Sequence, residues 1–244
     1  MSMSDRSHLP YAAAVDGIEQ HVRYEERLSD SQFIERIWRT ASDLDDVCLA
    51  IADGRWDMMF FSHAGRCQVM ITGPQTTAIT IPHAAGAEWL GIRFRLGVTM
   101  QHVAIPALVN EGVDLPKATH HSFWLDNAAW SLPDYENADT FVERLARRDL
   151  LAGDTVVQSA LDGEAQPWSP RALQYRFQQT IGLTAKTIQQ IERAQSAVVL
   201  LQQGTSIADV VFQLGYYDQP HLTNALRRFM GRTPAQIMNA NTTK

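Results

Sequence analysis

The sequence predicts two domains, a mainly β domain that ends in helices and an all-α domain after it. Short strand-like segments broken by turn residues fill most of the first hundred residues. A helical pattern occurs twice in the last third of the chain, with its copies 49 residues apart. The length of 244 residues suits two domains of roughly 150 and 90 residues. We expect a β-rich domain over 1–137, a connecting helix over 138–153 and a helical domain over 154–244.

The β-rich part is predicted from regularly spaced apolar and β-branched segments. Turn-forming pairs such as Gly54-Arg55 and Gly73-Pro74 separate them. Several short strands at this spacing are typical of a sandwich or a barrel. The expected strands are 18–28, 32–40, 47–53, 56–62, 67–72, 76–81 and 89–95.

Helical segments are expected after these strands. Residues 105–116 predict a short helical excursion, and 138–152 predict a longer helix with Phe141, Leu145 and Leu150 on one side. That helix could pack between the domains or pair two subunits.

The repeated pattern covers 169–185 and 218–234. Both copies open with a residue whose side chain can cap a helix, Ser169 and Asp218. Both close with a glycine, Gly182 and Gly231, which suits the left-handed residue that ends a helix. Each copy therefore predicts one helix of about three turns. Apolar residues superpose as one stripe: Leu173 on Leu222, Phe177 on Leu226 and Ile181 on Met230.

The face opposite this stripe is polar in both copies. Arg, Gln and Asn side chains can hydrogen-bond to base edges in the major groove of DNA. A solvated surface offers an ordinary alternative for either helix alone, but the repetition favours DNA. The expected base-contacting residues are Arg171, Gln174, Tyr175 and Gln178 in the first copy and Pro220, Thr223, Asn224 and Arg227 in the second. The expected phosphate-contacting residues are Ser169, Lys186 and Arg228.

Each copy also has a preceding helix, as a helix-turn-helix requires. Residues 205–214 predict a short helix before the second copy, and Gly215 permits the sharp turn. A poorer equivalent, with Val156, Val157 and Leu161, precedes the first copy. Residues 186–202 contain no Pro or Gly and predict a helix that connects the two units.

These motifs resemble the DNA-binding domain of the AraC/XylS transcriptional regulators. The chain carries S-P-R-x-L-Q-x-R-F-x-x-x-x-G-L-T, then S-I-A-D-V-V-x-x-L-G-Y-x-D-Q-x-H-L, then R-R-F-M-G-R-T-P. The resemblance spans about 154–241 and implies a double helix-turn-helix. Leu222 and Leu226 stand where the family usually has Phe, which volume-tolerant cores accept. Asn224 stands where Arg is common, so the family's base preference does not transfer.

Basic and acidic residues are distributed unevenly between the two predicted parts of the chain. The net charge is −6, but residues 165–244 hold eight basic and three acidic residues, which gives +5 and leaves −11 for the rest. A basic C-terminal part fits a DNA reader joined to another module. We find no apolar run long enough to cross a bilayer and no signal-peptide core. With only two cysteines, we expect a cytoplasmic protein.

The order of β domain and helices is similar to regulators of this family with a cupin-like sensor domain. That resemblance implies a small-molecule effector of unknown identity. Aromatic strand residues could line its pocket, with Arg93 or Arg95 receiving an anionic group, although alternation places these arginines outward if Ile92 and Phe94 face inward. The candidate pocket residues are Trp38, Trp56, Phe60, Trp89 and Phe94.

We therefore expect a transcription regulator that binds double-stranded DNA, with no catalytic residues, no metal and no cofactor. RNA polymerase and a second copy of the chain remain open as further partners. The alternative is a cupin-type small-molecule-binding protein or metal enzyme with a helical interaction domain. Cupin enzymes use an H-x-H pair, and no H-x-H occurs here, although His120-His121 is present.

Overall fold

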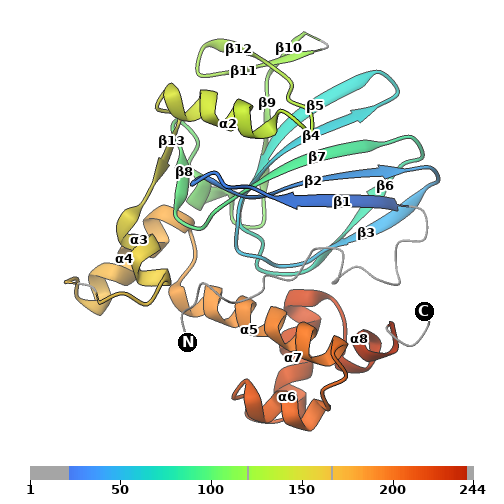
Figure 1. Ribbon diagram of the computed structural model, residues 1–244, viewed down its shortest axis with the longest axis vertical. Helices are drawn as coiled ribbons and strands as arrows, with labels where there is room; N and C mark the ends of the chain where they lie inside the picture. The colour runs from blue at the N-terminus through green and yellow to red at the C-terminus, as the bar shows by residue number, and fades with distance from the viewer. Residues whose placement is uncertain (1–21, 120, 166, 241–244) are drawn as a thin grey trace.

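A mainly β domain is followed by a chain of helices in the computed structural model (Figure 1). The structure describes residues 22–119, 121–165 and 167–240. Residues 18–21 of the first expected strand and His120 lie outside this part of the chain. The predicted order of a β domain and then an α domain is confirmed.

The centre of the β domain is an antiparallel sheet of six strands. Its order is β1 (Val22–Leu28), β2 (Ile34–Ser42), β7 (Glu88–Phe94), β4 (Asp57–His63), β5 (Arg66–Thr72) and β9 (Gly112–Leu115). A separate antiparallel ribbon joins β3 (Asp46–Ala50) to β6 (Ile79–His83). A strand therefore overlaps each of the seven segments expected from the sequence.

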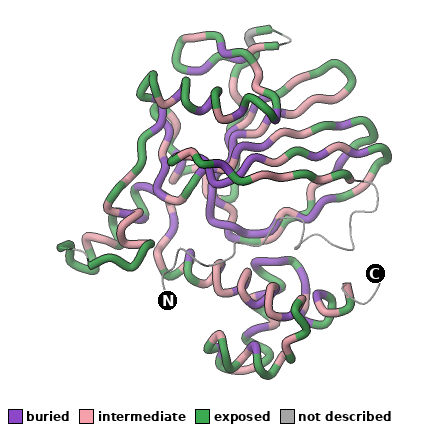
Figure 2. Tube along the Cα trace, viewed as in Figure 1, coloured by how far each residue is buried: buried purple, intermediate pink, exposed green. Residues whose placement is uncertain are grey.

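One face of the large sheet forms the main core beneath helix α2 (Ala138–Arg147) (Figure 1). Alternation along the strands turns Met58, Phe60 and Ile92 to this face, where Phe141 of α2 meets the ring of Phe60 edge-on at 5.8 Å. Burying apolar side chains on one face is what holds a sheet and a covering helix together. The buried residues run along these strands in Figure 2.

Helix α2 ends at Arg147, so the expected helix over 138–152 was too long. Asp149 has a φ of 56°, a left-handed conformation that stops a helix. The following residues form β13 (Leu151–Gly153), which pairs with β8 (Val98–Met100). Short elements complete the β domain: η2 (Ile105–Leu108), β10 (Lys117–Thr119), β11 (Ser122–Leu125) and β12 (Ala128–Ser131).

The helical part forms two similar units joined by one long helix, α5 (Ala185–Gln202). The first unit is α3 (Thr155–Leu161) with α4 (Pro170–Ile181), and the second is α6 (Ile207–Gln213) with α7 (Gln219–Met230). Helix α8 (Pro234–Ala240) follows. Among the described residues, no helix is both long and apolar enough to cross a membrane.

The helical part shares a hydrophobic core with the β domain. Leu49, Ile51 and Ala52 are buried in one cluster with Val198 of α5 and Leu226 of α7. In Figure 1, α5 and α7 lie beneath the side of the β domain that carries β3 and β6.

Candidate nucleic-acid interface

The two candidate recognition helices, α4 and α7, are capped in the same way at both ends. The Ser169 hydroxyl accepts from the amide of Ala172, and the Asp218 carboxylate accepts from the amide of His221. Gly182 and Gly231 end the helices in the left-handed conformation. The helix boundaries predicted from the repeat are therefore confirmed.

Asp154 holds the first unit together. Its carboxylate caps α3 through the amides of Val156 and Val157, and it also accepts from Arg176 at 2.6 Å and from Thr180 at 2.8 Å, both on α4. Burial alone would raise the pKa of Asp154, but the hydrogen bonds from Arg176, Thr180 and Val157 outweigh it and lower that pKa. One carboxylate thus fixes α3 against α4.

The second unit turns from α6 into α7 at Gly215, as predicted. Ser206 caps α6 by accepting from the amide of Asp209. Tyr216 is buried directly after the turn, and the ring of His221 meets it edge-on at 5.2 Å. Leu222 and Leu226 are fully buried, so leucine fills the positions where the resembled family usually has Phe.

The expected reading faces of both helices are accessible. Of the eight residues expected to contact bases, all are exposed except Thr223, which is half-buried. Tyr175 exposes 65% of its surface. The expected phosphate contacts Ser169, Lys186 and Arg228 are exposed as well. The residues of both sets lie on α4 and α7, except Ser169, which caps α4, and Lys186, which stands in the first turn of α5. A helix-turn-helix presents such a surface to DNA.

Two exposed aromatic residues at these helix starts were not expected. Trp168 and Tyr217 directly precede the caps of α4 and α7, and they are 48% and 91% exposed. They stand 49 residues apart, the spacing of the repeat. Extending each copy of the repeat by one residue at its start would have placed Trp168 opposite Tyr217, but their exposure could not have been predicted from that match.

The β domain contacts the end of each recognition helix. The amide of Ala52 donates to the carbonyl of Phe229 at 2.8 Å, and the amide of Ala78 donates to that of Arg228 at 2.8 Å. A Cβ added at Gly231 would lie 2.8 Å from the side chain of Leu49. The equivalent residue of the first unit, Gly182, meets η2 and the residue after it in the same way.

Around Gly182, the added Cβ would lie 2.8 Å from the backbone of Pro106 and from the Val109 side chain. We call these two contacts the helix-end contacts. One joins η2 to the end of α4, and the other joins Leu49 and Ala78 to the end of α7. Because they hold corresponding points of the two units, the β domain fixes one unit relative to the other.

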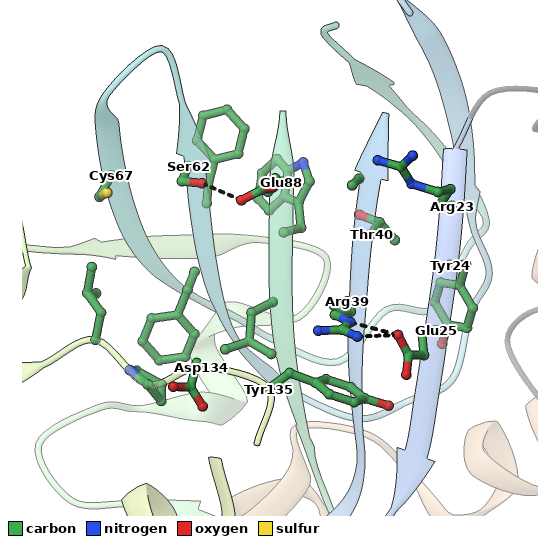
Figure 3. Close-up of a pocket in the computed structure, with 17 residues that line it drawn as sticks. Arg23, Tyr24, Glu25, Arg39, Thr40, Ser62, Cys67, Glu88, Asp134 and Tyr135 are labelled. Carbon is green, nitrogen blue, oxygen red and sulfur yellow. Dashed lines mark hydrogen bonds and ion pairs between the residues drawn. The ribbon is translucent and has the colours of Figure 1, made fainter. Parts of the chain in front are cut away.

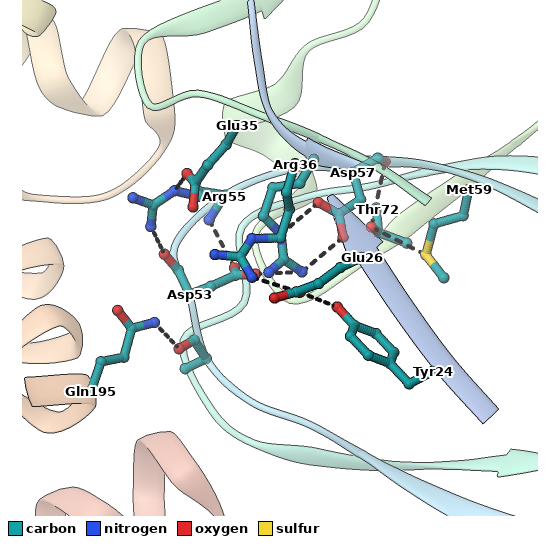
Figure 4. Close-up of polar contacts among 12 residues, drawn as sticks. Tyr24, Glu26, Glu35, Arg36, Asp53, Arg55, Asp57, Met59, Thr72 and Gln195 are labelled. Atoms are coloured by element: carbon teal, nitrogen blue, oxygen red, sulfur yellow. Dashed lines mark hydrogen bonds and ion pairs between the residues drawn. The ribbon is translucent and has the colours of Figure 1, made fainter. Parts of the chain in front are cut away.

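A buried polar network lies next to the helix-end contacts (Figure 4). Arg93 forms ion pairs with Asp53 at 2.8 Å and Asp57 at 3.0 Å. Arg55 pairs with Glu35, and Gln195 of α5 donates to the carbonyl of Ala52 at 3.4 Å. Burial raises the pKa of Asp53, and the charge of Arg93 opposes that rise.

The network corrects one expectation about Arg93. It lies on the opposite face from Ile92 and Phe94, as strand alternation requires, but its side chain is ion-paired with two carboxylates there and is only 11% exposed. Its charge is already neutralised, so it is unsuited to receive an anionic ligand. Arg95 donates to the carbonyls of Ser29 and Ser31.

The β domain has a cavity of about 570 Å³ over one end of the large sheet (Figure 3). Phe60, Leu90 and Leu132 give it an apolar lining. Ion-paired Arg39 and Glu25 lie at its side, with the Arg39 guanidinium 4.4 Å from the ring centre of Tyr135. An apolar lining with a few fixed polar groups is typical of small-molecule sites.

Two of the five candidate pocket aromatics, Phe60 and Trp89, line this cavity. The structure places the others elsewhere: Trp56 and Phe94 stack at 3.8 Å in the main core, and Trp38 stacks on Tyr24. Within the described ranges, no three His, Cys, Asp or Glu side chains gather as metal ligands would.

Comparison with known proteins identifies one domain. Residues 167–240 match the family model described as a helix-turn-helix domain. The match covers α4 to α8, which includes both candidate recognition helices. No curated protein and no solved structure matches the chain.

Proposed function

We propose that this chain is a DNA-binding transcription regulator of the AraC type and that it reads a specific DNA sequence with two helices. The helix-turn-helix match over residues 167–240 supports this proposal. Helices α4 and α7 enter successive major grooves on one side of the duplex, roughly 34 Å apart. Because their reading faces differ, the target consists of two unlike elements.

The observation that carries this proposal is the matched pair of helices. Each is capped by a side chain, ended by a left-handed glycine and exposed on its polar face. The 18-residue helix α5 separates them. A structural helix pair would not need two exposed polar faces at equivalent positions, each with an Arg side chain and a Gln or Asn side chain.

Selection of bound sequences from a random duplex pool tests the proposal. We expect a recovered site of two unlike elements and an affinity that falls steeply with salt, because bound phosphates release their counterions. Recovery of no common sequence, or an affinity that does not change with salt, would refute sequence-specific binding.

We further propose that a small molecule in the β-domain cavity controls this binding. The cavity adjoins Arg39 and Glu25 on strands of the same sheet that carries Arg93 and Asp57. That network extends to the 52–55 turn and so to the helix-end contacts. A ligand that shifts these strands would therefore change how the two recognition helices are held.

A further inference from the structure

A second, smaller cavity of about 180 Å³ lies between α5 and α7. Gln190 and Arg193 line it from α5, and His221, Asn224 and Arg228 line it from α7. No carboxylate is among its lining residues, and the two guanidinium groups give the walls a positive charge. A concave site with this charge favours an anion.

Aromatic rings orient both guanidinium groups. Arg193 lies 4.3 Å from the ring centre of Tyr216, which is only 5% exposed. Arg228 lies 5.0 Å from that of Phe229. A guanidinium held over an aromatic ring has a restricted orientation, and its forked N–H donors suit a tetrahedral oxyanion.

His221 adds a further donor. The amide of Tyr217 donates to its Nδ1 at 3.3 Å, so the proton of the neutral ring belongs on Nε2. The carboxylate of Asp218, the nearest acid along the chain, accepts from the backbone amide of His221 as the helix cap.

We propose that this cavity binds one phosphate of the DNA backbone beside the bases that α7 reads. The inference rests on the proposed function. Asn224 belongs both to the cavity and to the reading face of α7, so an anion here lies next to that face. A volume of about 180 Å³ equals several water molecules at about 30 Å³ each, enough for one phosphate group. The pocket therefore fixes the depth and register of α7 in its groove.

The test uses the full chain and the duplex recovered from the random pool. Each phosphate is replaced in turn by a neutral methylphosphonate, and binding is compared between the native protein and Arg193→Gln/Arg228→Gln. One linkage beside the second element should weaken native binding about tenfold. The same linkage should have less than about a twofold effect on the double variant. The double variant should also reduce the slope of log K against log salt by about one.

The control is Arg147→Gln, which removes an exposed arginine of α2 and should leave the methylphosphonate profile unchanged. Arg228→Gln alone, at an exposed position, should show the same loss more weakly and serves if the double variant does not fold. The proposal is overturned if every linkage affects native and variant protein equally while both still select the same sequence. It is also overturned if inorganic phosphate raises the melting temperature of the native protein but not of the double variant, while no methylphosphonate linkage distinguishes the two proteins in DNA binding. If the native protein shows no salt-dependent duplex binding at all, the proposed function itself is refuted.

Discussion

Arg171 and Arg227 are exposed on the polar faces of different recognition helices. Arg227→Ala should cost about 1–3 kcal/mol in binding and relax base preference in the second element only. Arg171→Ala should do the same in the first element. Binding to a set of single-base variants of the selected duplex checks both. The paired-helix account would be wrong if the two substitutions relaxed the same base position.

Gly231 and Gly215 permit a test of the helix-end contact at α7. Their φ values are almost equal, 67° and 66°, but a Cβ at Gly231 would lie 2.8 Å from Leu49, whereas one at Gly215 meets nothing within 4 Å. Gly215→Ala should therefore cost only the left-handed strain, about 1–2 kcal/mol. Gly231→Ala should cost more, because Leu49 must also move. If both variants lose the same free energy of unfolding in urea, the contact of Gly231 with Leu49 is not tightly packed.

At the scale of elements, Asp154 joins α3 to α4. Asp154→Ala should destabilise the protein by about 1–2 kcal/mol through loss of the helix cap. Asp154→Asn keeps a capping side chain and should lose less, since Arg176 is 49% exposed and its ion pair is screened. The free energies of unfolding of both variants in urea measure the contributions of the helix cap and of the ion pair with Arg176 separately.

The Asp154 carboxylate also makes stability depend on pH. Its pKa is lowered in the folded protein, so its contribution is present above the unfolded value of about 3.9 and is lost as pH falls through the folded pKa. Asp154→Asn should therefore lose less stability than the native protein on acidification through this range. Parallel curves for the two proteins would contradict the assigned pKa shift.

The sequence predicted the helices that carry their own end signals. Ser169, Asp218, Gly182 and Gly231 fixed both recognition helices because caps act through neighbouring residues. Helix α2 was predicted five residues too long because its end depends on the pairing of β13 with β8, some fifty residues away in the sequence. Trp168 and Tyr217 were missed because exposure is a tertiary property.

At the scale of the whole molecule, the sequence did not indicate what lies between the β domain and the helices. Alternation put Arg93 on the outward face if Ile92 and Phe94 face inward, but it did not indicate that Asp53, from the turn after β3, would pair with Arg93 there and leave it 11% exposed. The contacts of Leu49 and Pro106 with the two helix-ending glycines depend on how the domains meet. Periodicity within a segment carries no information of that kind.

The cavity of the β domain predicts a ligand response of the whole chain. A small molecule at one hundred times its dissociation constant should stabilise the protein by about 2.7 kcal/mol and change its affinity for DNA. Ser62 lines the cavity, so Ser62→Trp should fill it and abolish both effects. The stabilisation is measured as a thermal shift across a metabolite library, and the change in DNA affinity by titration with the duplex. A shift that survives in Ser62→Trp would place the ligand elsewhere.

The central claim is that one chain places α4 and α7 in successive major grooves on one side of DNA. The most direct test is to insert five base pairs between the two elements of the selected duplex and to measure the affinity of the full chain. Half a helical turn moves the second element to the opposite side, and α5 is one continuous helix. The account predicts that the insertion removes the contribution of one element and shortens a footprint of about 17–20 base pairs to one half. Unchanged affinity and an unbroken footprint across the insertion would contradict it.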